Sequence, residues 1–148
     1  MTQEQKQLLI KDLYARVPYG VIVDYKENEF EAPHWKITAI YPDTFDGRIG
    51  YDKRVGAGYE SGSRPFKIGE VKPYLRHMSS MTEEEKMEVT KLGVCYDGAF
   101  HNDIYDIGIG MDEAFTAISW FLERHFDINY LIEKGLALEA PEGMYETV

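Results

Sequence analysis

Carboxylate and imidazole side chains gather between residues 97 and 113 of this chain, among several glycines. The members of this cluster are Asp97, His101, Asp103, Asp106, Asp112 and Glu113. Carboxylates bind hard cations, and an imidazole beside a carboxylate can join a transition-metal site or act as a general base. One hypothesis is therefore a metal-dependent enzyme. Its predicted ligands are His101, Asp103, Asp106 and Asp112.

The alternative for this cluster is a turn-rich loop that holds no metal. An EF-hand needs oxygen ligands at alternate positions, a central glycine and a closing glutamate, and the run from Asp103 to Gly108 lacks this pattern. In a loop, Asp and Asn side chains bond their own backbone, and Asp112 caps the helix that follows. The chain also lacks the H-E-x-x-H and G-x-S-x-G motifs of hydrolases. We favour the loop and expect no cofactor.

Basic and aromatic residues are interleaved between residues 48 and 76. The basic ones are Arg48, Lys53, Arg54, Arg64, Lys67, Lys72 and Arg76, and the aromatic ones are Tyr51, Tyr59, Phe66 and Tyr74. Basic side chains contact phosphates, and aromatic rings stack on bases. This segment therefore predicts a surface for single-stranded nucleic acid, the alternative being a solvated glycine-rich loop. The predicted contact residues are Arg54, Tyr59, Arg64 and Lys67.

The charge is divided unevenly along the chain, whose net charge is −10. Residues 1–76 carry 12 basic and 11 acidic side chains, whereas residues 77–148 carry 4 and 15. An acidic half repels a polyanion and attracts a basic surface of another chain. We therefore rank association with a protein partner or a second copy first, nucleic-acid binding second and metal-dependent catalysis third. The predicted partner contacts are Glu83, Glu84 and Glu85.

Composition and cysteine content indicate a folded, soluble, cytoplasmic protein. The length of 148 residues and the apolar fraction of 44% suit a single domain with its own core. The single cysteine, Cys95, excludes an internal disulfide and fits a reducing compartment. The first residues lack the basic and apolar pattern of a signal peptide, and no run approaches the roughly 18 apolar residues of a membrane span.

The first half of the chain predicts one helix followed by a small sheet. Thr2 and Gln5 have capping-box spacing, and apolar residues recur at helical intervals until Pro18, so we expect a helix over residues 3–16. Runs rich in β-branched and aromatic residues predict antiparallel strands, and Pro73 is expected to end the sheet. These runs cover residues 19–26, 35–41, 48–54 and 66–71. The predicted class is α+β, with about four strands that resemble a partly closed SH3-type barrel.

The second half predicts helices. Thr82 and Glu85 form a second capping box at the start of a helix over residues 83–92, where the acidic run also faces the positive end of the helix dipole. Apolar residues at three- or four-residue spacing predict a helix from Met111 to Leu122, and Gly135 is expected to end a short helix over 128–134. The expected single domain covers residues 1–148, with the acidic helical part from about residue 77.

Two strings of sequence carry a resemblance to a known family. The first runs from Val71 to Glu85 (VKPYLRHMSSMTEEE), and the second comprises His125-Phe126-Asp127 with Leu131 to Pro141 (LIEKGLALEAP). These strings resemble uncharacterised short proteins encoded by gut Bacteroidales-type bacteria, often within prophages or other mobile regions. The resemblance implies a phage-related accessory protein and no reaction, cofactor or binding residue.

Overall fold

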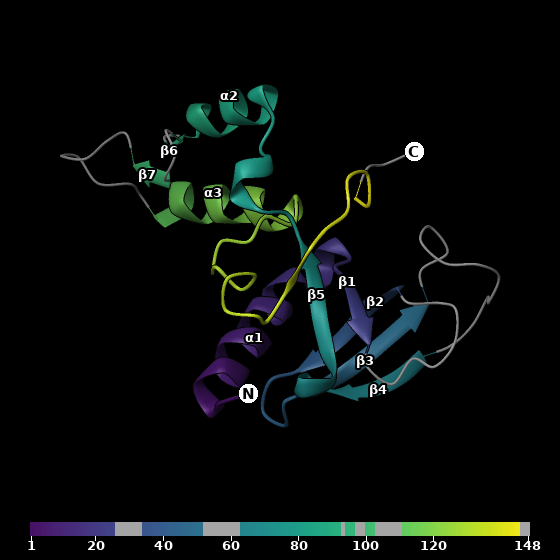
Figure 1. Cartoon of the computed structure of the whole chain (residues 1–148). Helices are drawn as coiled ribbons and strands as arrows, with labels where there is room; N and C mark the ends of the chain where they lie inside the picture. The colour runs from purple at the N-terminus through teal and green to yellow at the C-terminus, as the bar shows by residue number, and fades with distance from the viewer. Residues whose placement is uncertain (26–33, 52–62, 93, 97–99, 103–110, 146–148) are drawn as a thin grey trace.

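The computed structural model describes residues 1–25, 34–51, 63–92, 94–96, 100–102 and 111–145. At residues 34, 51, 94–96, 100–102 and 111–113 it describes the backbone alone. Helix α1 and a six-stranded mixed sheet form one part, and helices α2 and α3 with a two-stranded hairpin lie beyond one end of the sheet (Figure 1). The α+β class predicted from the sequence is confirmed.

Helix α1 spans Gln3–Arg16, as predicted. Thr2 caps it, because its hydroxyl accepts the Gln5 N–H while the Gln5 side chain accepts the Thr2 N–H. Leu9 and Leu13, four residues apart and therefore on the same side of the helix, are completely buried against the sheet. The 3-10 turn Val17–Tyr19 follows, and Gly20 ends it with a φ of 71°.

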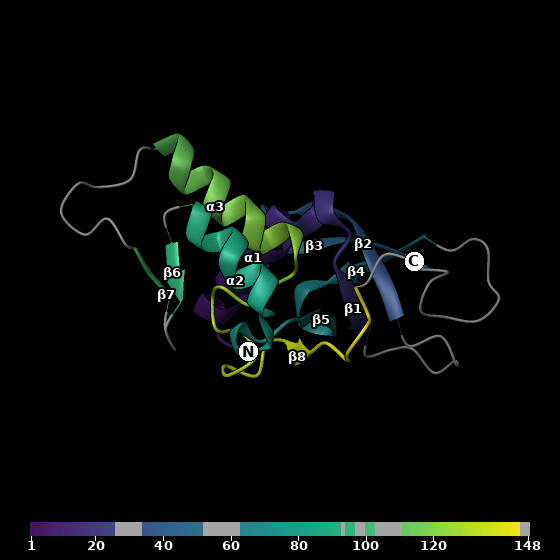
Figure 2. The ribbon, with the colours of Figure 1, turned by 90° about the horizontal axis from the view of Figure 1, so that it is seen from above.

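The large sheet has the strand order β4-β3-β2-β1-β5-β8. Every pair is antiparallel except β5 with β8, which are parallel and lie side by side in Figure 2. The strands are β1 Ile22–Tyr25, β2 His34–Tyr41, β3 Asp46–Tyr51, β4 Ser63–Lys67, β5 Val71–Leu75 and β8 Leu138–Glu139.

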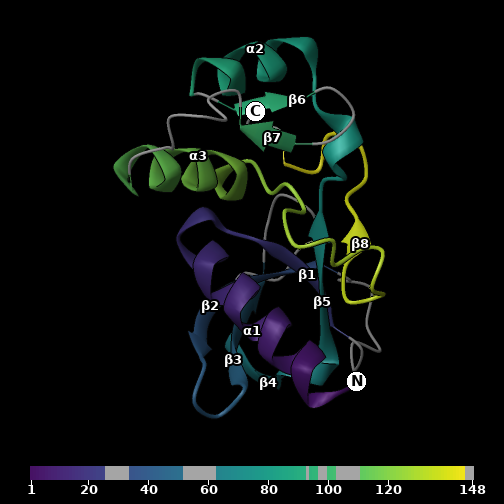
Figure 3. The same ribbon diagram turned by 90° about the vertical axis from the view of Figure 1, so that its left-hand side faces the viewer.

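Alternate side chains of the strands pack against α1, which lies across one face of the sheet (Figure 3). Val23, Ile37 and Ile49 on this face are at most 1% exposed. Gly47 pairs with Phe66 across strands β3 and β4, and a Cβ at Gly47 would collide with the backbone carbonyl of Ala39 and lie 2.8 Å from the Phe66 ring. Glycine is therefore needed at this position so that the aromatic ring can cover the strand.

The sheet differs from its prediction in strand number and in its limits. Six strands are present where about four were expected, and SH3-type closure is not confirmed, because β4 and β8 lie at opposite ends of the strand order. The predicted strand over 66–71 is interrupted by the 3-10 turn Ile68–Glu70. Pro73 lies inside β5, opposite Val23 and before the two residues that pair with β8. A proline is tolerated in a strand where its missing N–H is not required.

The second half of the chain contains the 3-10 turn Met78–Ser80, α2 (Glu83–Lys91), the hairpin of β6 (Val94–Tyr96) and β7 (Phe100–Asn102), and α3 (Met111–Glu123). The predicted starts of both helices are confirmed, whereas the hairpin was not predicted. A second core cluster joins these elements, and its buried members are Met81, Val89, Trp120, Phe121 and Phe126. Stacked and edge-to-face contacts connect the three aromatic rings.

The predicted helix over residues 128–134 is wrong, since this segment forms turns. Tyr130 has a φ of 56°, a left-handed conformation that interrupts a right-handed helix. The buried carboxylate of Asp127 accepts the N–H groups of Leu131 and Ile132 at 2.8 and 2.9 Å, which satisfies donors that a helix would have paired internally. Within the described ranges, no helix is long and apolar enough to cross a membrane.

Candidate functional site

A cavity of about 830 Å³ lies where the end of the sheet meets the second half of the chain. Its walls come from the segment between Arg76 and Glu85, the end of α3 with the turn after it, the segment from Glu139 to Tyr145, and Tyr19. We call this cavity the cleft. Because its walls are distant in sequence, only the folded chain forms it.

Arg76 is the central residue of the cleft. Its N–H donates to the His125 carbonyl at 2.7 Å, and its own carbonyl accepts the Asp127 N–H at 2.9 Å. Its guanidinium lies 4.2 Å from the centre of the Phe126 ring and donates to both carboxylate oxygens of Glu85, at 2.8 and 2.7 Å. These contacts fix the Arg76 side chain between the second core cluster and α2, so its charge is held in one position.

Glu85 belongs both to the N-terminal cap of α2 and to the wall of the cleft. It completes the capping box with Thr82, whose N–H donates to the Glu85 carboxylate at 3.0 Å. Burial alone would raise the pKa of Glu85, but the hydrogen bonds from Arg76 and Thr82 and the charge of Arg76 outweigh it, so the pKa is lowered. The carboxylate is therefore ionised at neutral pH and neutralised by Arg76.

The C-terminal wall of the cleft is attached to the sheet. The Ala140 N–H donates to the Leu75 carbonyl at 2.8 Å, just after β8. The Tyr145 hydroxyl donates to the Tyr74 carbonyl at 2.6 Å and accepts the Ile22 N–H at 3.0 Å. Its ring stacks on His125 with centroids 3.7 Å apart. The segment from Glu139 to Tyr145 is thus anchored at both of its ends.

Negative charge predominates around the cleft. Two arginines face five glutamates there: Arg76 and Arg124 against Glu84, Glu85, Glu123, Glu139 and Glu142. Arg76 is paired with Glu85, and Arg124 is paired with Glu88 at 3.1 Å and lies 3.8 Å from Glu123. The other three glutamates are exposed and form no ion pair with a residue whose position is described: Glu84, Glu139 and Glu142. These carboxylates suit a cationic ligand.

Ser79 lies beside the cleft and contacts His77, which lines it. The Ser79 hydroxyl lies 2.7 Å from His77 Nδ1, and the Ser79 N–H donates to the same nitrogen at 3.1 Å. This is the local geometry of a turn whose first residue caps its own backbone. A hydrolytic triad needs a third group that orients the imidazole, and no carboxylate of the described ranges bonds His77. The contact therefore stabilises the turn.

The predicted partner residues Glu83, Glu84 and Glu85 have three different environments. Glu83 pairs with Lys86 at 3.1 Å on the surface of α2, and Glu85 is bound by Arg76 and Thr82. Glu84 alone lines the cleft with an exposed carboxylate that lacks an ion pair to the described part of the chain. Neutralising the whole run would therefore also disturb the fold.

The other predicted sites are described only in part. Arg54 and Tyr59 lie outside the described residues, whereas Arg64 and Lys67 lie in β4. Of the predicted metal ligands, Asp103 and Asp106 are outside them, and His101 and Asp112 are described by their backbone alone, in β7 and α3. The described residues contain no group of three or more His, Cys, Asp or Glu side chains suited to a metal.

No protein-family model, curated protein or solved structure matches this chain. The two strings that carry the family resemblance nevertheless meet in the fold, since β5 pairs with β8 and Arg76 with Phe126. Sequence reasoning missed Arg76, Glu139, Glu142 and Tyr145 as cleft residues. The sequence indicated only that this part of the chain is acidic. These residues come together because β5 pairs with β8, a strand of two residues that lies more than 60 positions away in the sequence.

Proposed function

We propose that this chain is a non-enzymatic protein-association module whose cleft binds a basic segment of a partner protein. The observation that carries the proposal is the convergence of Glu84, Glu139 and Glu142 on one cavity, with no ion pair to other described residues. The resemblance to uncharacterised proteins that are often encoded within prophages favours a host or phage protein as the partner. A second copy of the chain is the alternative partner.

The cavity is large enough for this role. Its volume of about 830 Å³ falls within the range of roughly 300–1,000 Å³ that is typical of ligand sites, and it can hold several side chains of an extended segment. Each exposed ion pair contributes only about 0.2–1 kcal/mol. Affinity therefore requires several lysines or arginines to meet the three carboxylates together, and the acidic field of the second half accelerates encounter.

The test is binding of labelled peptides of equal length, one rich in lysine and arginine and one rich in glutamate, measured by fluorescence anisotropy. We expect saturable binding of the basic peptide alone, weakening as salt rises. The triple variant Glu84→Gln, Glu139→Gln, Glu142→Gln should weaken it at least tenfold. Glu85 is left unchanged because it supports α2.

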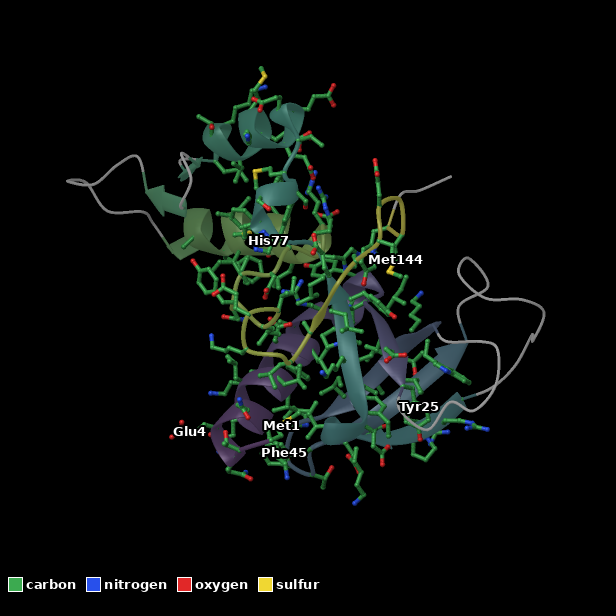
Figure 4. The ribbon with its side chains drawn as sticks, viewed as in Figure 1. Met1, Glu4, Tyr25, Phe45, His77 and Met144 are labelled. Carbon is green, nitrogen blue, oxygen red and sulfur yellow. The ribbon has the colours of Figure 1, made fainter. Side chains whose placement is uncertain are left out.

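The matched control removes three exposed carboxylates elsewhere, by Glu4→Gln, Asp43→Asn and Glu133→Gln. Glu4 lies at the start of α1, on the far side of the molecule from His77 and Met144 of the cleft (Figure 4). If the control weakens binding as much as the triple variant, the basic peptide is attracted by the net charge of the protein, and the cleft is excluded as its binding site. Equal binding of both peptides, or of neither, would also contradict the proposal.

A further inference from the structure

The face of the sheet turned away from α1 brings together basic side chains that are distant in sequence. We call it the outer face. Residues paired directly across strands share a face, and side chains alternate along each strand except at the β-bulge of β2 between Ile37 and Ala39. Lys36 pairs with Gly50, Arg48 with Ala39 and Pro65, and Lys67 with Asp46. Their neighbours Ile37, Ile49 and Phe66 are buried on the other face, so the three basic side chains lie on the outer face.

The register places these three charges on a line. Lys36 in β2 pairs with Gly50 in β3, and Arg48 lies two residues before Gly50. Arg48 in turn pairs with Pro65 in β4, and Lys67 lies two residues after Pro65. Each step is thus a diagonal between neighbouring strands, and such neighbours lie about 7–8 Å apart. Lys36, Arg48 and Lys67 therefore form a diagonal row of positive charges across β2, β3 and β4, with the β-bulge of β2 at the step from Lys36 to Arg48.

The side chains beside this row leave it accessible. Lys36 and Lys67 are exposed and form no ion pair with a described residue, and Asp46 bonds Thr44 instead of its cross-strand neighbour Lys67. The Arg48 side chain is held toward β4 by its Nε, which donates to the Ser63 hydroxyl at 2.8 Å. Small or flat residues surround the row: Thr38, Ala39, Gly50, Ser63 and Pro65.

We infer that the outer face binds the phosphate backbone of single-stranded nucleic acid along the row Lys36–Arg48–Lys67. A linear polyanion meets successive cations along such a row, while hydroxyls beside it donate further hydrogen bonds to phosphate oxygens. Tyr41 at the end of β2, 48% exposed and in the same cross-strand row as Lys67, offers a ring on which a base can stack. This site is independent of the cleft and of its proposed function.

The row differs from the set of contact residues predicted from the sequence. Arg64 was predicted beside Lys67, but successive residues of β4 alternate, and the Arg64 guanidinium lies 5.8 Å from the Trp35 ring on the face turned toward α1. Lys36 lies in β2, outside the basic and aromatic segment 48–76, and comes beside Arg48 only through the pairing of β2 with β3. Lys36, Arg48 and Lys67 are chosen from the strand register and not from their spacing along the chain.

The experiment titrates the full chain with labelled single-stranded DNA and RNA 12-mers at several salt concentrations. For single strands, the logarithm of the binding constant falls with the logarithm of salt concentration with a slope of about −0.7 per phosphate neutralised. The variant Lys36→Gln, Lys67→Gln should weaken binding and reduce the size of this slope by about 1.4. Tyr41→Leu should weaken binding without changing the slope.

The matched control is Lys11→Gln, Lys91→Gln, which removes the same charge from exposed lysines of α1 and α2. It should leave the slope unchanged, and circular dichroism confirms that every variant is folded. Absence of binding at low salt, or an equal slope change in the control, would overturn the inference. If polyglutamate of matched charge displaces the oligonucleotide at equal concentration, the outer face recognises an acidic protein instead, and the nucleic-acid assignment is wrong.

Discussion

The guanidinium of Arg16 and the carboxylate of Asp12, one turn earlier in α1, form an ion pair whose side chains are both completely buried. Nε and Oδ1 are 2.6 Å apart. Arg16 also donates to the Phe126 carbonyl at 2.7 Å, and the Asn129 amide donates to Asp12 at 2.8 Å. The pair therefore connects α1 to the turn that follows α3. It also joins the core cluster beneath α1 to the second core cluster, which contains Phe126.

Removing one partner of this pair should destabilise the protein strongly. The variant Asp12→Leu leaves the Arg16 charge buried and uncompensated, and such changes cost about 3–5 kcal/mol. The double variant Asp12→Leu, Arg16→Met removes both charges and should recover part of the loss. Urea unfolding followed by circular dichroism measures both. A double variant less stable than Asp12→Leu would show that Arg16 acts mainly through Phe126.

The elements that sequence reasoning predicted well are those encoded locally. Capping boxes at Thr2 and Thr82 and the apolar periodicity gave α1, α2 and α3 nearly to the residue, because each cap bonds a group three positions away. The helix over 128–134 failed because its periodicity competes with the Asp127 side chain and the left-handed Tyr130.

The candidate sites were less predictable, since both depend on pairing between distant segments. Glu84 and Glu139 meet only because β8 adds to β5, and a strand of two residues carries no periodic signal. On the sheet, a pairing register that is wrong by one residue moves every side chain of a strand to the opposite face. Composition could therefore suggest a basic surface but could not show that Lys36 and Arg64 lie on opposite faces of the sheet.

Asp127 should contribute to stability through the two N–H groups that its carboxylate accepts. Asp127→Ala leaves the donors of Leu131 and Ile132 unsatisfied in a buried or partly buried position, at a cost of about 1–3 kcal/mol for each fully buried donor. Asp127→Asn, whose amide oxygen can still accept, should lose less. Denaturant unfolding provides the measurement, and Glu133→Ala in the same segment, exposed at its surface, should change stability by less than about 0.5 kcal/mol.

Glu85 should make the stability of the protein dependent on acid. Its pKa is lower in the folded chain than the ordinary value of 4.5, so the contribution of the charged carboxylate is complete above that value and is lost as pH falls through the folded pKa. The variant Glu85→Gln lacks this pH-dependent contribution to stability. The difference in melting temperature between the native chain and the variant should be greatest near neutral pH and shrink as pH falls below 4.5.

The same acid-dependent component should disappear when the partner is removed. Arg76→Met deletes the guanidinium that binds both oxygens of Glu85, so combining it with Glu85→Gln should cost less than the sum of the two single changes. The double-mutant cycle is measured from melting curves of the native chain, both single variants and the double variant at pH 7 and pH 3.5. If Glu85→Gln loses stability equally at both pH values, its carboxylate charge does not contribute and the capping contact alone explains the loss.

The Tyr145 hydroxyl should hold the C-terminal wall of the cleft against the sheet. Tyr145→Phe keeps the ring that stacks on His125 but removes the bonds to Tyr74 and Ile22, and each such bond contributes about 0.5–1.5 kcal/mol. Hydrogen exchange should therefore accelerate at the Ile22 amide, which loses its acceptor, and at the Ala140 amide, if the segment from Glu139 to Tyr145 opens as a unit. Tyr14→Phe on α1, at an exposed position, is the control and should leave both amides unchanged. Acceleration at Ile22 alone would show that β8 holds the wall without Tyr145.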